Sequence, residues 1–421
     1  MSIESTMNAL GQAARDAAQI LSQASAENKT RALHAAATAI RAQAAQILAA
    51  NATDVAGAKD LTPALRERLT LTPARIEAMA HGLDTVADLP DPVGRVLAAW
   101  DVAANGLHFE KIAVPLGVIG IIYESRPNVT ADAAALAIKS GNAVILRGGS
   151  ESFHSSRAIL AALQEGLRAH HLPVEAAQLV PTTDRAAVAH MLTMSDFIDV
   201  IIPRGGRSLN ERVKQEARVP TLLHLDGNCH LYLDKAADEA TAFAVTLNAK
   251  LRRTGICGAL ETLLIHTDCL TTMAPKIIAE LLDKGCELRG DAAIRELDPR
   301  ILPATEEDWA TEFLGPILAV KSVGSLEEAI AHINRYGSHH TDAIITEDSQ
   351  AAETFLNRVD SAIVLVNAST QFADGGEFGF GAEIGIATGR LHARGPVAAA
   401  ELTTYKYKVT TTTPSGAIRK G

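Results

Sequence analysis

Across residues 111–226 the sequence alternates short apolar runs with helical segments, and this pattern restricts the fold more than any other feature. Apolar strands joined by helical crossovers have to lie parallel, in a sheet that is buried on both faces. The sequence therefore predicts an α/β fold with a doubly wound domain of the nucleotide-binding type. The expected strands are 112–124, 143–146, 178–181, 199–202 and 221–225, and the expected helices are 132–139, 155–167, 185–194 and 208–216.

Two glycine pairs stand immediately after expected strands, each with an arginine beside it. Gly148-Gly149 follows Arg147, and Gly205-Gly206 follows Arg204. Free backbone N–H groups between the end of a strand and the start of a helix are suited to binding phosphate. Neither pair completes the G-x-G-x-x-G pattern, so a plain turn is the alternative for each.

Outside this region the chain begins with helices and ends with a strand. The first hundred residues show helical periodicity and capping signals and no catalytic signal. Asn105-Gly106 is a strong hairpin signal, placed over 101–114. A lone two-stranded ribbon is marginal in water, so we expect it to pack on something else, such as another subunit. Residues 401–412 alternate Thr, Tyr, Lys and Val, which indicates an edge strand able to join another sheet.

A second α/β unit follows and contains Cys257, shortly before an apolar strand at 262–265. Lys250, Arg252 and Arg253 precede the cysteine. Nearby positive charge lowers the pKa of a thiol and so favours the thiolate, which is the nucleophile in cysteine chemistry. The same cations are able to attract an anionic substrate. The alternative is that Cys257 is a small buried hydrophobe, as most cysteines are.

Composition argues against several classes of partner. The 421 residues carry a formal net charge of −10, and an acidic surface binds neither nucleic acid nor an anionic membrane readily. The four cysteines form no CxxC pair, and adjacent residues such as His339 and His340 do not converge on one ion, so no metal is expected. The sequence shows no secretory leader and no apolar run of ~18 residues. We therefore expect a reduced, cytoplasmic protein.

Four strings of residues spread along the chain point to one family: 123–130 (YESRPNVT), 146–149 (LRGG), 226–230 (DGNCH) and 337–342 (GSHHTD). With its helical start, hairpin, doubly wound half, cysteine half and C-terminal strand, the chain resembles the aldehyde dehydrogenase superfamily over essentially its whole length. Within that superfamily, the four strings resemble the γ-glutamyl phosphate reductases, also called glutamate-5-semialdehyde dehydrogenases.

The resemblance implies a reaction and the residues that perform it. The reaction is the NADPH-dependent reduction of L-glutamyl 5-phosphate to L-glutamate 5-semialdehyde with release of phosphate, in proline biosynthesis, through a cysteine thioester. By position, Cys257 matches the nucleophile and Asn128 matches the side-chain amide of the oxyanion hole. Glu312 matches the residue that holds the nicotinamide ribose, and Arg147 replaces a lysine that contacts the adenosine ribose.

The cofactor choice and the substrate contacts follow from the same resemblance. Ser150 stands where members that use NAD often carry a glutamate, so we expect NADPH over NADH. The expected cofactor-binding residues are Arg147, Gly148, Gly149, Ser150, Gly205, Gly206 and Glu312. The candidates for the α-amino and α-carboxylate groups of the substrate are Lys250, Arg253, His339 and His340.

The resemblance also implies a domain order and partners. An NADP-binding domain is expected over 1–100 and 115–226, and a catalytic domain over 227–395. The hairpin at 101–114 and the C-terminal residues 401–421 are expected to form a small β oligomerisation element. The implied partners are the small-molecule substrate, a second copy of the chain in a dimer or tetramer, and, transiently, glutamate 5-kinase.

Four positions depart from the patterns of these families. Around the cysteine, Thr254 replaces a proline, Gly258 an asparagine and Arg252 an uncharged residue. His224 stands where hydrolytic aldehyde dehydrogenases carry the glutamate that activates water. The alternatives are therefore an enzyme that hydrolyses its acyl-enzyme or passes the acyl group to coenzyme A, and a nucleotide-binding scaffold without turnover.

Overall fold

The structure, a computed structural model, describes residues 2–59, 61–223, 226–411 and 416–418. The chain forms two compact units. Unit 1 comprises Met1–Leu223, Gly379–Gly385 and Val397–Gly421, and unit 2 comprises His224–Phe378 and Ile386–Pro396. The sequence predicts one continuous segment over 227–395, whereas the stretch Gly379–Gly385 packs with unit 1.

Unit 1 begins with helices, as the sequence predicts. Local signals set their starts: Ser2 and Ser25 accept hydrogen bonds from backbone N–H groups of the first turns, and Thr72 does so before Pro73. One face of each of the longer helices is buried in the core of the unit. These helices are α1 (Ile3–Leu21), α2 (Ala26–Ala42), α3 (Ala44–Gly57), α4 (Pro63–Leu69) and α5 (Pro73–Asp88).

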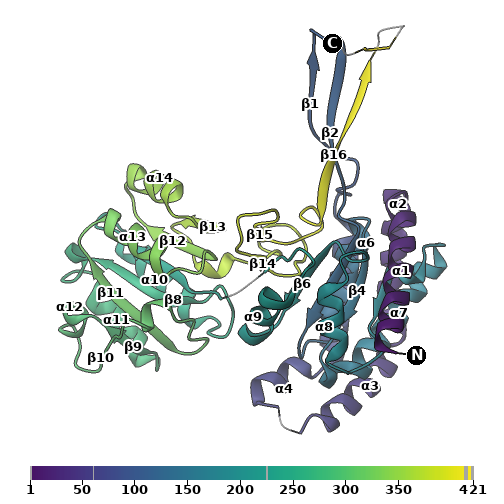
Figure 1. Ribbon diagram of the computed structural model, residues 1–421. Helices are drawn as coiled ribbons and strands as arrows, with labels where there is room; N and C mark the ends of the chain where they lie inside the picture. The colour runs from purple at the N-terminus through teal and green to yellow at the C-terminus, as the bar shows by residue number, and fades with distance from the viewer. Residues whose placement is uncertain (1, 60, 224–225, 412–415, 419–421) are drawn as a thin grey trace. The chain divides into compact units, whose positions relative to one another are not determined.

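A parallel four-stranded sheet in the order β5-β4-β3-β6 forms the centre of unit 1 (Figure 1). Every residue of β3 and β4 is buried, which agrees with the largely apolar sequence of both strands. The predicted parallel α/β architecture is thus confirmed. The strands are β3 (Val118–Tyr123), β4 (Ala143–Arg147), β5 (Ala177–Leu179) and β6 (Val200–Arg204), and the helices between and after them are α6 (Val129–Lys139), α7 (Phe153–Ala169), α8 (Ala186–Thr193) and α9 (Arg207–Glu216).

One predicted strand of this sheet, at 221–225, is present in the described residues only as a single bridge. In the described part of 221–225, only Thr221 pairs with the sheet, through a single parallel bridge to Ile201. His224 lies outside the described residues.

A three-stranded antiparallel ribbon in the order β1-β2-β16 also belongs to unit 1 (Figure 1). β1 (Val96–Val102) and β2 (Leu107–Pro115) are joined through Asn105-Gly106, so the hairpin is confirmed, although it begins before residue 101. β16 (Thr403–Thr411) pairs with β2 over its whole length and forms an edge. The predicted C-terminal strand therefore joins the hairpin of its own chain.

Unit 2 is built on a parallel seven-stranded sheet in the order β10-β9-β11-β8-β7-β12-β13. Apolar side chains from β7, β8 and β11 and from the helices around them form its buried core. The strands are β7 (Cys229–Leu233), β8 (Leu260–His266), β9 (Glu287–Gly290), β10 (Leu302–Pro303), β11 (Ile317–Val323), β12 (Thr341–Ile345) and β13 (Ile363–Val366). The helices are α10 (Glu239–Leu251), α11 (Ala274–Asp283), α12 (Ala292–Arg295), α13 (Leu326–Tyr336) and α14 (Ser349–Arg358), and a short pair, β14 (Ile386–Ala387) and β15 (Gly395–Pro396), completes the unit.

Candidate active site

Cys257 lies in the turn that joins α10 to β8 in unit 2, and its side chain is partly exposed. The other three cysteines are buried. Burial raises the pKa of Cys269 and of Cys286 to about 11, and it raises the pKa of Cys229 well above its usual range. Among the four cysteines, only Cys257 therefore combines a free thiol with access to solvent, which a nucleophile requires.

The backbone of this turn is held from two sides. A Cβ atom on Gly227 would lie 2.1 Å from the carbonyl oxygen of Cys257, so only glycine allows this close approach. The thiol of Cys229 donates to the same carbonyl oxygen at 3.1 Å. On the other side, the hydroxyl of Thr370 donates to the carbonyl oxygen of Gly258 at 2.7 Å. The nucleophile is thus carried by a short segment whose carbonyl groups are fixed.

The structure corrects the expected role of Lys250 as a substrate ligand. Its side chain is 0% exposed, and its Nζ lies 2.6 Å from Oε2 of Glu261, which is equally buried. Burial raises the pKa of Glu261 to about 7, although Lys250 and the backbone N–H of Leu314 oppose this shift. Lys250 therefore exposes no surface to a substrate, and its ion-pair partner is Glu261.

The two arginines before Cys257 differ in their surroundings. Nε of Arg252 donates to Oε1 of Gln371 at 2.8 Å, and the amide of Gln371 donates in turn to the carbonyl oxygens of Ala249 and Arg253. Arg253 is exposed, and its guanidinium makes no hydrogen bond or ion pair with the described residues. Arg253 is therefore available to an anionic ligand.

The adjacent histidines lie in different surroundings. His340 is fully buried, and its Nδ1 lies 2.8 Å from Oγ1 of Thr341 and 3.6 Å from Sγ of Cys229. Because Cys229 donates to the carbonyl oxygen of Cys257, His340 is connected to the nucleophile segment through one thiol. His339 has a positive φ of 61°, and its Nδ1 lies 2.5 Å from the carbonyl oxygen of Asp360.

Glu312 lies in the same neighbourhood as Cys257. Burial raises the pKa of its carboxyl, while a hydrogen bond from the backbone N–H of Gly227 and the field of His340 act in the opposite direction. Gly227 therefore contacts both the Cys257 turn and Glu312. Within unit 2, the structure brings together the expected nucleophile, the expected ribose ligand and one of the expected substrate ligands.

Asn128 belongs to unit 1, where it precedes the first residue of α6. Its side-chain Nδ2 donates to Oδ2 of Asp132 at 2.8 Å, one helical turn further on. Burial raises the pKa of Asp132 to about 6, although the hydrogen bond from Asn128 and the field of Arg204 oppose this shift. The amide of Asn128 is thus oriented by a carboxyl group of its own helix.

The two glycine pairs lie at the carboxyl ends of strands on either side of β3. Gly148-Gly149 follows β4, Gly205-Gly206 follows β6, and the parallel pairing places both ends at one edge of the sheet. The N–H of Gly206, at the start of α9, already donates to a carboxylate oxygen of Glu124 at 3.0 Å. A Cβ on Gly149 would lie 2.1 Å from Oε1 of Glu151. Backbone N–H groups between the end of a strand and the start of a helix suit a phosphate-bearing cofactor.

The surroundings of Arg147 differ from its expected role on the adenosine ribose. The residue is only 7% exposed, and its guanidinium donates to the carbonyl oxygens of Gly148 and Thr183, the latter at 2.9 Å. Burial lowers its pKa. Arg147 therefore braces the loops after β4 and β5 and does not present its charge at the surface. Ser150 begins the short 3₁₀ turn Ser150–Ser152 in the first of these loops.

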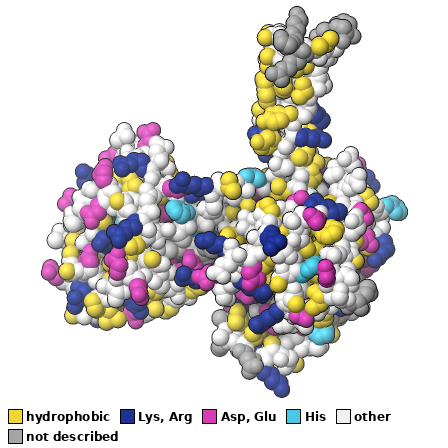
Figure 2. Space-filling model, in the orientation of Figure 1, with side chains coloured by type: hydrophobic (Ala, Val, Ile, Leu, Met, Phe, Trp, Pro, Cys, Tyr) yellow, Lys and Arg dark blue, Asp and Glu magenta, His cyan; other side chains and the backbone are white. Residues whose placement is uncertain are grey.

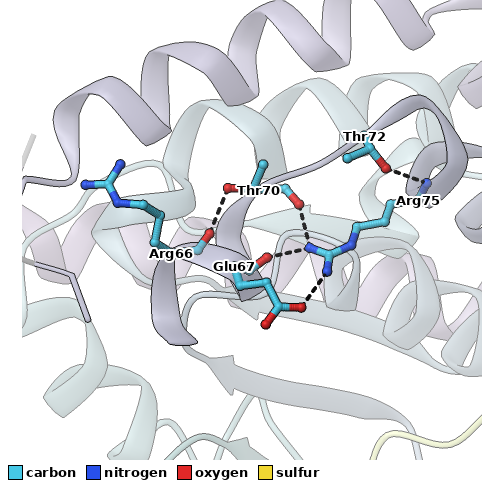
Figure 3. A pocket seen from close by; sticks show the side chains of 5 residues that line it. All are labelled: Arg66, Glu67, Thr70, Thr72 and Arg75. Carbon is cyan, nitrogen blue, oxygen red and sulfur yellow. Dashed lines mark hydrogen bonds and ion pairs between the residues drawn. The ribbon is translucent and has the colours of Figure 1, made fainter. Parts of the chain in front are cut away.

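A surface pocket of unit 1 is lined by none of the residues predicted for the site. A pocket of about 440 Å³ on the surface of unit 1 is lined by Arg66, Glu67, Thr70, Thr72 and Arg75 (Figure 3). Its central guanidinium, that of Arg75, is already bound to Glu67 and Thr70. In the described part of the chain, no group of His, Cys, Asp or Glu side chains could hold a metal ion, and no helix has the length and apolarity to cross a membrane.

Sequence reasoning missed four residues that shape these sites: Gly227, Cys229, Asp132 and Glu124. Gly227 and Cys229 stand inside the string 226–230, but only the tertiary structure places them against Cys257. Asp132 stands four residues after Asn128, a spacing that puts two side chains on one helix face and was a usable signal. Nothing in the sequence pairs Glu124 with Gly206.

Comparison with known proteins places the chain in a family. The model of the aldehyde dehydrogenase family matches residues 2–294 and 297–394. The γ-glutamyl phosphate reductase of Paramagnetospirillum magneticum is 59% identical over 421 residues, which cover 100% of this chain and 99% of that protein. The γ-glutamyl phosphate reductase of Rhodospirillum rubrum is 59% identical over 402 residues, covering 95% of this chain and 94% of that protein.

A solved structure agrees with these relatives. The crystal structure of γ-glutamyl phosphate reductase from Thermotoga maritima is 42% identical in sequence and superposes with a TM-score of 0.95, covering 98% of this chain and 100% of that chain. The family model and the relatives extend over almost the entire sequence, and the relatives are far above the identity at which a family is in question. The chain belongs to the aldehyde dehydrogenase family of oxidoreductases and, within it, to the γ-glutamyl phosphate reductases.

Proposed function

We propose that this chain catalyses the NADPH-dependent reduction of L-glutamyl 5-phosphate to L-glutamate 5-semialdehyde, with release of phosphate, as a step of proline biosynthesis. The observation that carries the proposal is the setting of Cys257. Its thiol is free and partly exposed in a turn whose backbone is fixed by neighbouring residues, while the other three cysteines are buried. The full-length similarity to γ-glutamyl phosphate reductases supports this substrate and product.

In the proposed mechanism, the thiolate of Cys257 attacks the carbonyl carbon of the acyl phosphate. The side-chain amide of Asn128 and the backbone N–H of Cys257 stabilise the oxyanion that develops. Collapse of the tetrahedral adduct breaks the bond to phosphate and leaves a thioester on Cys257. After reduction, a second collapse returns the thiolate and releases the aldehyde.

NADPH, when bound, supplies the hydride that reduces the thioester. The glycine pairs Gly148-Gly149 and Gly205-Gly206 suit the phosphates, since the N–H of Gly206 already donates to a carboxylate. In this proposal Glu312 holds the nicotinamide ribose. With Ser150, this position carries no carboxylate that would repel a 2′-phosphate. We therefore propose NADPH over NADH.

The substrate also carries an α-amino and an α-carboxylate group, and the proposed pocket has to bind both. Arg253 suits the carboxylate because its guanidinium is exposed close to Cys257 in the sequence. His339 and His340 are proposed as hydrogen-bonding partners. Lys250 is not carried forward, because it is buried against Glu261.

We further propose that the β1-β2-β16 ribbon joins two copies of the chain in a homo-oligomer. Trp100, Tyr405, Tyr407 and Val409 are between 40% and 54% exposed on this ribbon. Trp100 contacts Phe109 and Tyr407 with ring centroids 5.4 and 6.1 Å apart, so these side chains share one face. Figure 2 shows hydrophobic side chains along the ribbon. Such a face on a thin sheet is suited to burial against another copy.

The reverse reaction tests the proposed function. Purified protein is given glutamate 5-semialdehyde and NADP, and NADPH formation is followed by absorbance with and without phosphate. We expect oxidation that is negligible without phosphate and rises with its concentration, because phosphate is the acyl acceptor. Steady oxidation in phosphate-free buffer would identify a hydrolytic aldehyde dehydrogenase, and acceleration by coenzyme A alone would identify an acyl-transferring one. If no oxidation occurs under any of these conditions, the proposed enzymatic function would be rejected.

A further inference from the structure

The amide of Asn128 is held by one carboxyl group. Its Nδ2 donates to Oδ2 of Asp132 at 2.8 Å, and both residues lie in unit 1 at the start of α6. An ionised carboxylate accepts hydrogen bonds and donates none, so it selects the NH₂ end of the amide and turns the oxygen end away. An amide nitrogen carries two hydrogens, and the one that Asp132 does not use is left for a second acceptor.

We propose that Asp132 is a positioning residue for catalysis: its carboxylate fixes the orientation of the Asn128 amide that stabilises the oxyanion. This role rests on the proposed function, in which Asn128 contributes to the oxyanion hole. Asp132 itself touches neither substrate nor cofactor in this account. An oxyanion-hole donor acts only if it is oriented before the reaction, so the geometry of the Asn128–Asp132 pair bears directly on the rate.

The surroundings of Asp132 bring the pKa of its carboxyl close to neutral pH. α5 approaches at Gly82, where a Cβ would lie 3.8 Å from Oδ1 of Asp132, so no side chain comes between them. Arg204 at the end of β6 is the charged group whose field reaches Asp132. The other ionisable groups on α5, α6, β3 and β4 are exposed or have partners of their own. His81 is exposed, and the remaining groups are Arg75, paired with Glu67; Glu77, paired with Arg41; Asp84, paired with His34 and Arg41; Asp88, paired with His34; Tyr123, bonded to Thr130; Lys139, bonded to Thr30 and Ala87; and Arg147, bonded to Gly148 and Thr183.

Burial raises the pKa of Asp132 from 3.8 to about 6, since Asn128 and Arg204 offset only part of its effect. Below this pH the carboxyl is protonated and becomes a donor, which no longer selects the NH₂ end of Asn128. The rate should therefore fall as the pH drops through about 6. The same shift has a consequence for stability. A carboxyl whose pKa is raised on folding is more stable protonated in the folded state, so its ionisation lowers stability as the pH rises from about 4 to 6.

The experiment compares Asp132→Asn and Asp132→Ala with the wild type between pH 5 and 8.5 in the phosphate-dependent reverse assay. The ratio of each variant to the wild type at the same pH cancels the titration of phosphate and semialdehyde. The amide of Asp132→Asn does not titrate and, like the protonated carboxyl, both donates and accepts, so we expect kcat to be lower than wild type at pH 8 and the ratio to the wild type to rise towards one below pH 6. Asp132→Ala should lose about 10- to 100-fold in kcat at pH 8, with the KM for NADP unchanged.

Thermal unfolding supplies a readout that does not depend on activity. Asp132→Asn should raise Tm at pH 8 and lose this advantage near pH 4, whereas a purely structural carboxylate would make the same variant less stable. Asp16→Asn, an exposed carboxylate on α1, is the matched control and should change neither profile. An Asp132→Asn enzyme that keeps the acid limb of the wild type, or an Asp132→Ala enzyme with unchanged kcat, would overturn the role of Asp132 in an active reductase. A wild type without any semialdehyde oxidation would overturn the proposed function itself and this role with it.

Discussion

Cys257 differs from the other three cysteines because it is accessible to solvent. Its turn leaves the thiol partly exposed, whereas burial raises the pKa values of Cys229, Cys269 and Cys286. Cys257→Ser should lower the rate by more than about 100-fold, because a serine hydroxyl is not ionised near neutral pH, while NADPH binding stays close to wild type. Steady-state rates and fluorescence titration with NADPH check this. Cys269→Ser is the control, and a Cys257→Ser enzyme that keeps a hundredth or more of the rate would assign Cys257 a structural role.

The buried ion pair of Lys250 and Glu261 affects the stability of the fold. Both side chains are 0% exposed and 2.6 Å apart, so removing one leaves the other as a buried charge without its partner. Lys250→Met should lower the free energy of unfolding by about 3–5 kcal/mol, as measured by urea denaturation, and Lys250→Met with Glu261→Leu should recover much of that loss. The exposed Lys284, paired with Glu280 at 3.3 Å, is the control: Lys284→Ala should cost less than about 1 kcal/mol. A Lys250→Met protein of normal stability and raised KM would return Lys250 to the substrate site.

In the β1-β2-β16 ribbon, β16 alternates apolar or aromatic side chains with charged ones, with a period of two. Along β16, Tyr405, Tyr407 and Val409 alternate with Lys406 and Lys408, so Tyr405, Tyr407 and Val409 share one largely apolar face. Lys111 of β2 lies on the same face, with its Nζ 3.6 Å from the centre of the Tyr405 ring. If the apolar face joins two copies, Tyr407→Lys should place a charge in that interface and shift the protein towards the monomer at micromolar concentration. Sedimentation velocity measures the shift. Ile20→Lys, on the exposed face of α1, should leave the oligomer unchanged, and a wild type that sediments as a monomer would refute the interface.

At the scale of the whole molecule, buried histidine shapes the dependence of stability on pH. Burial, with smaller effects from His230, Lys321 and Arg335, lowers the pKa of His332 from 6.5 to about 3. A histidine with a lowered pKa binds its proton less readily in the folded state, so it contributes stability above pH 6.5 that is lost as the pH falls towards 3. This loss should approach about 1.4 kcal/mol per pH unit. His332→Gln should flatten the fall of unfolding free energy between pH 6.5 and 4, while His154→Gln, at an exposed position, should not. Equal slopes in all three proteins would disprove this account.

The amino-acid sequence by itself determined the class of fold and the enzyme family of this protein. Uninterrupted apolar strands separated by helices dictate a parallel sheet, because such strands can be covered on both faces only by the helices that connect them. The hairpin at Asn105-Gly106 and the position of Cys257 shortly before a strand were readable from the sequence, because backbone conformation there depends on neighbours in the sequence.

Only the tertiary structure decided what each side chain near the site can do. Lys250 reads as a free cation in the sequence, yet it is buried against Glu261, and Arg147 reads as a ribose ligand, yet it braces two loops. The approach of Gly227 to Cys257 joins residues that are 30 positions apart. Burial and contact between distant segments arise when sheets and helices pack, and both the charge that a group carries and the partner that it finds depend on that packing and not on local sequence.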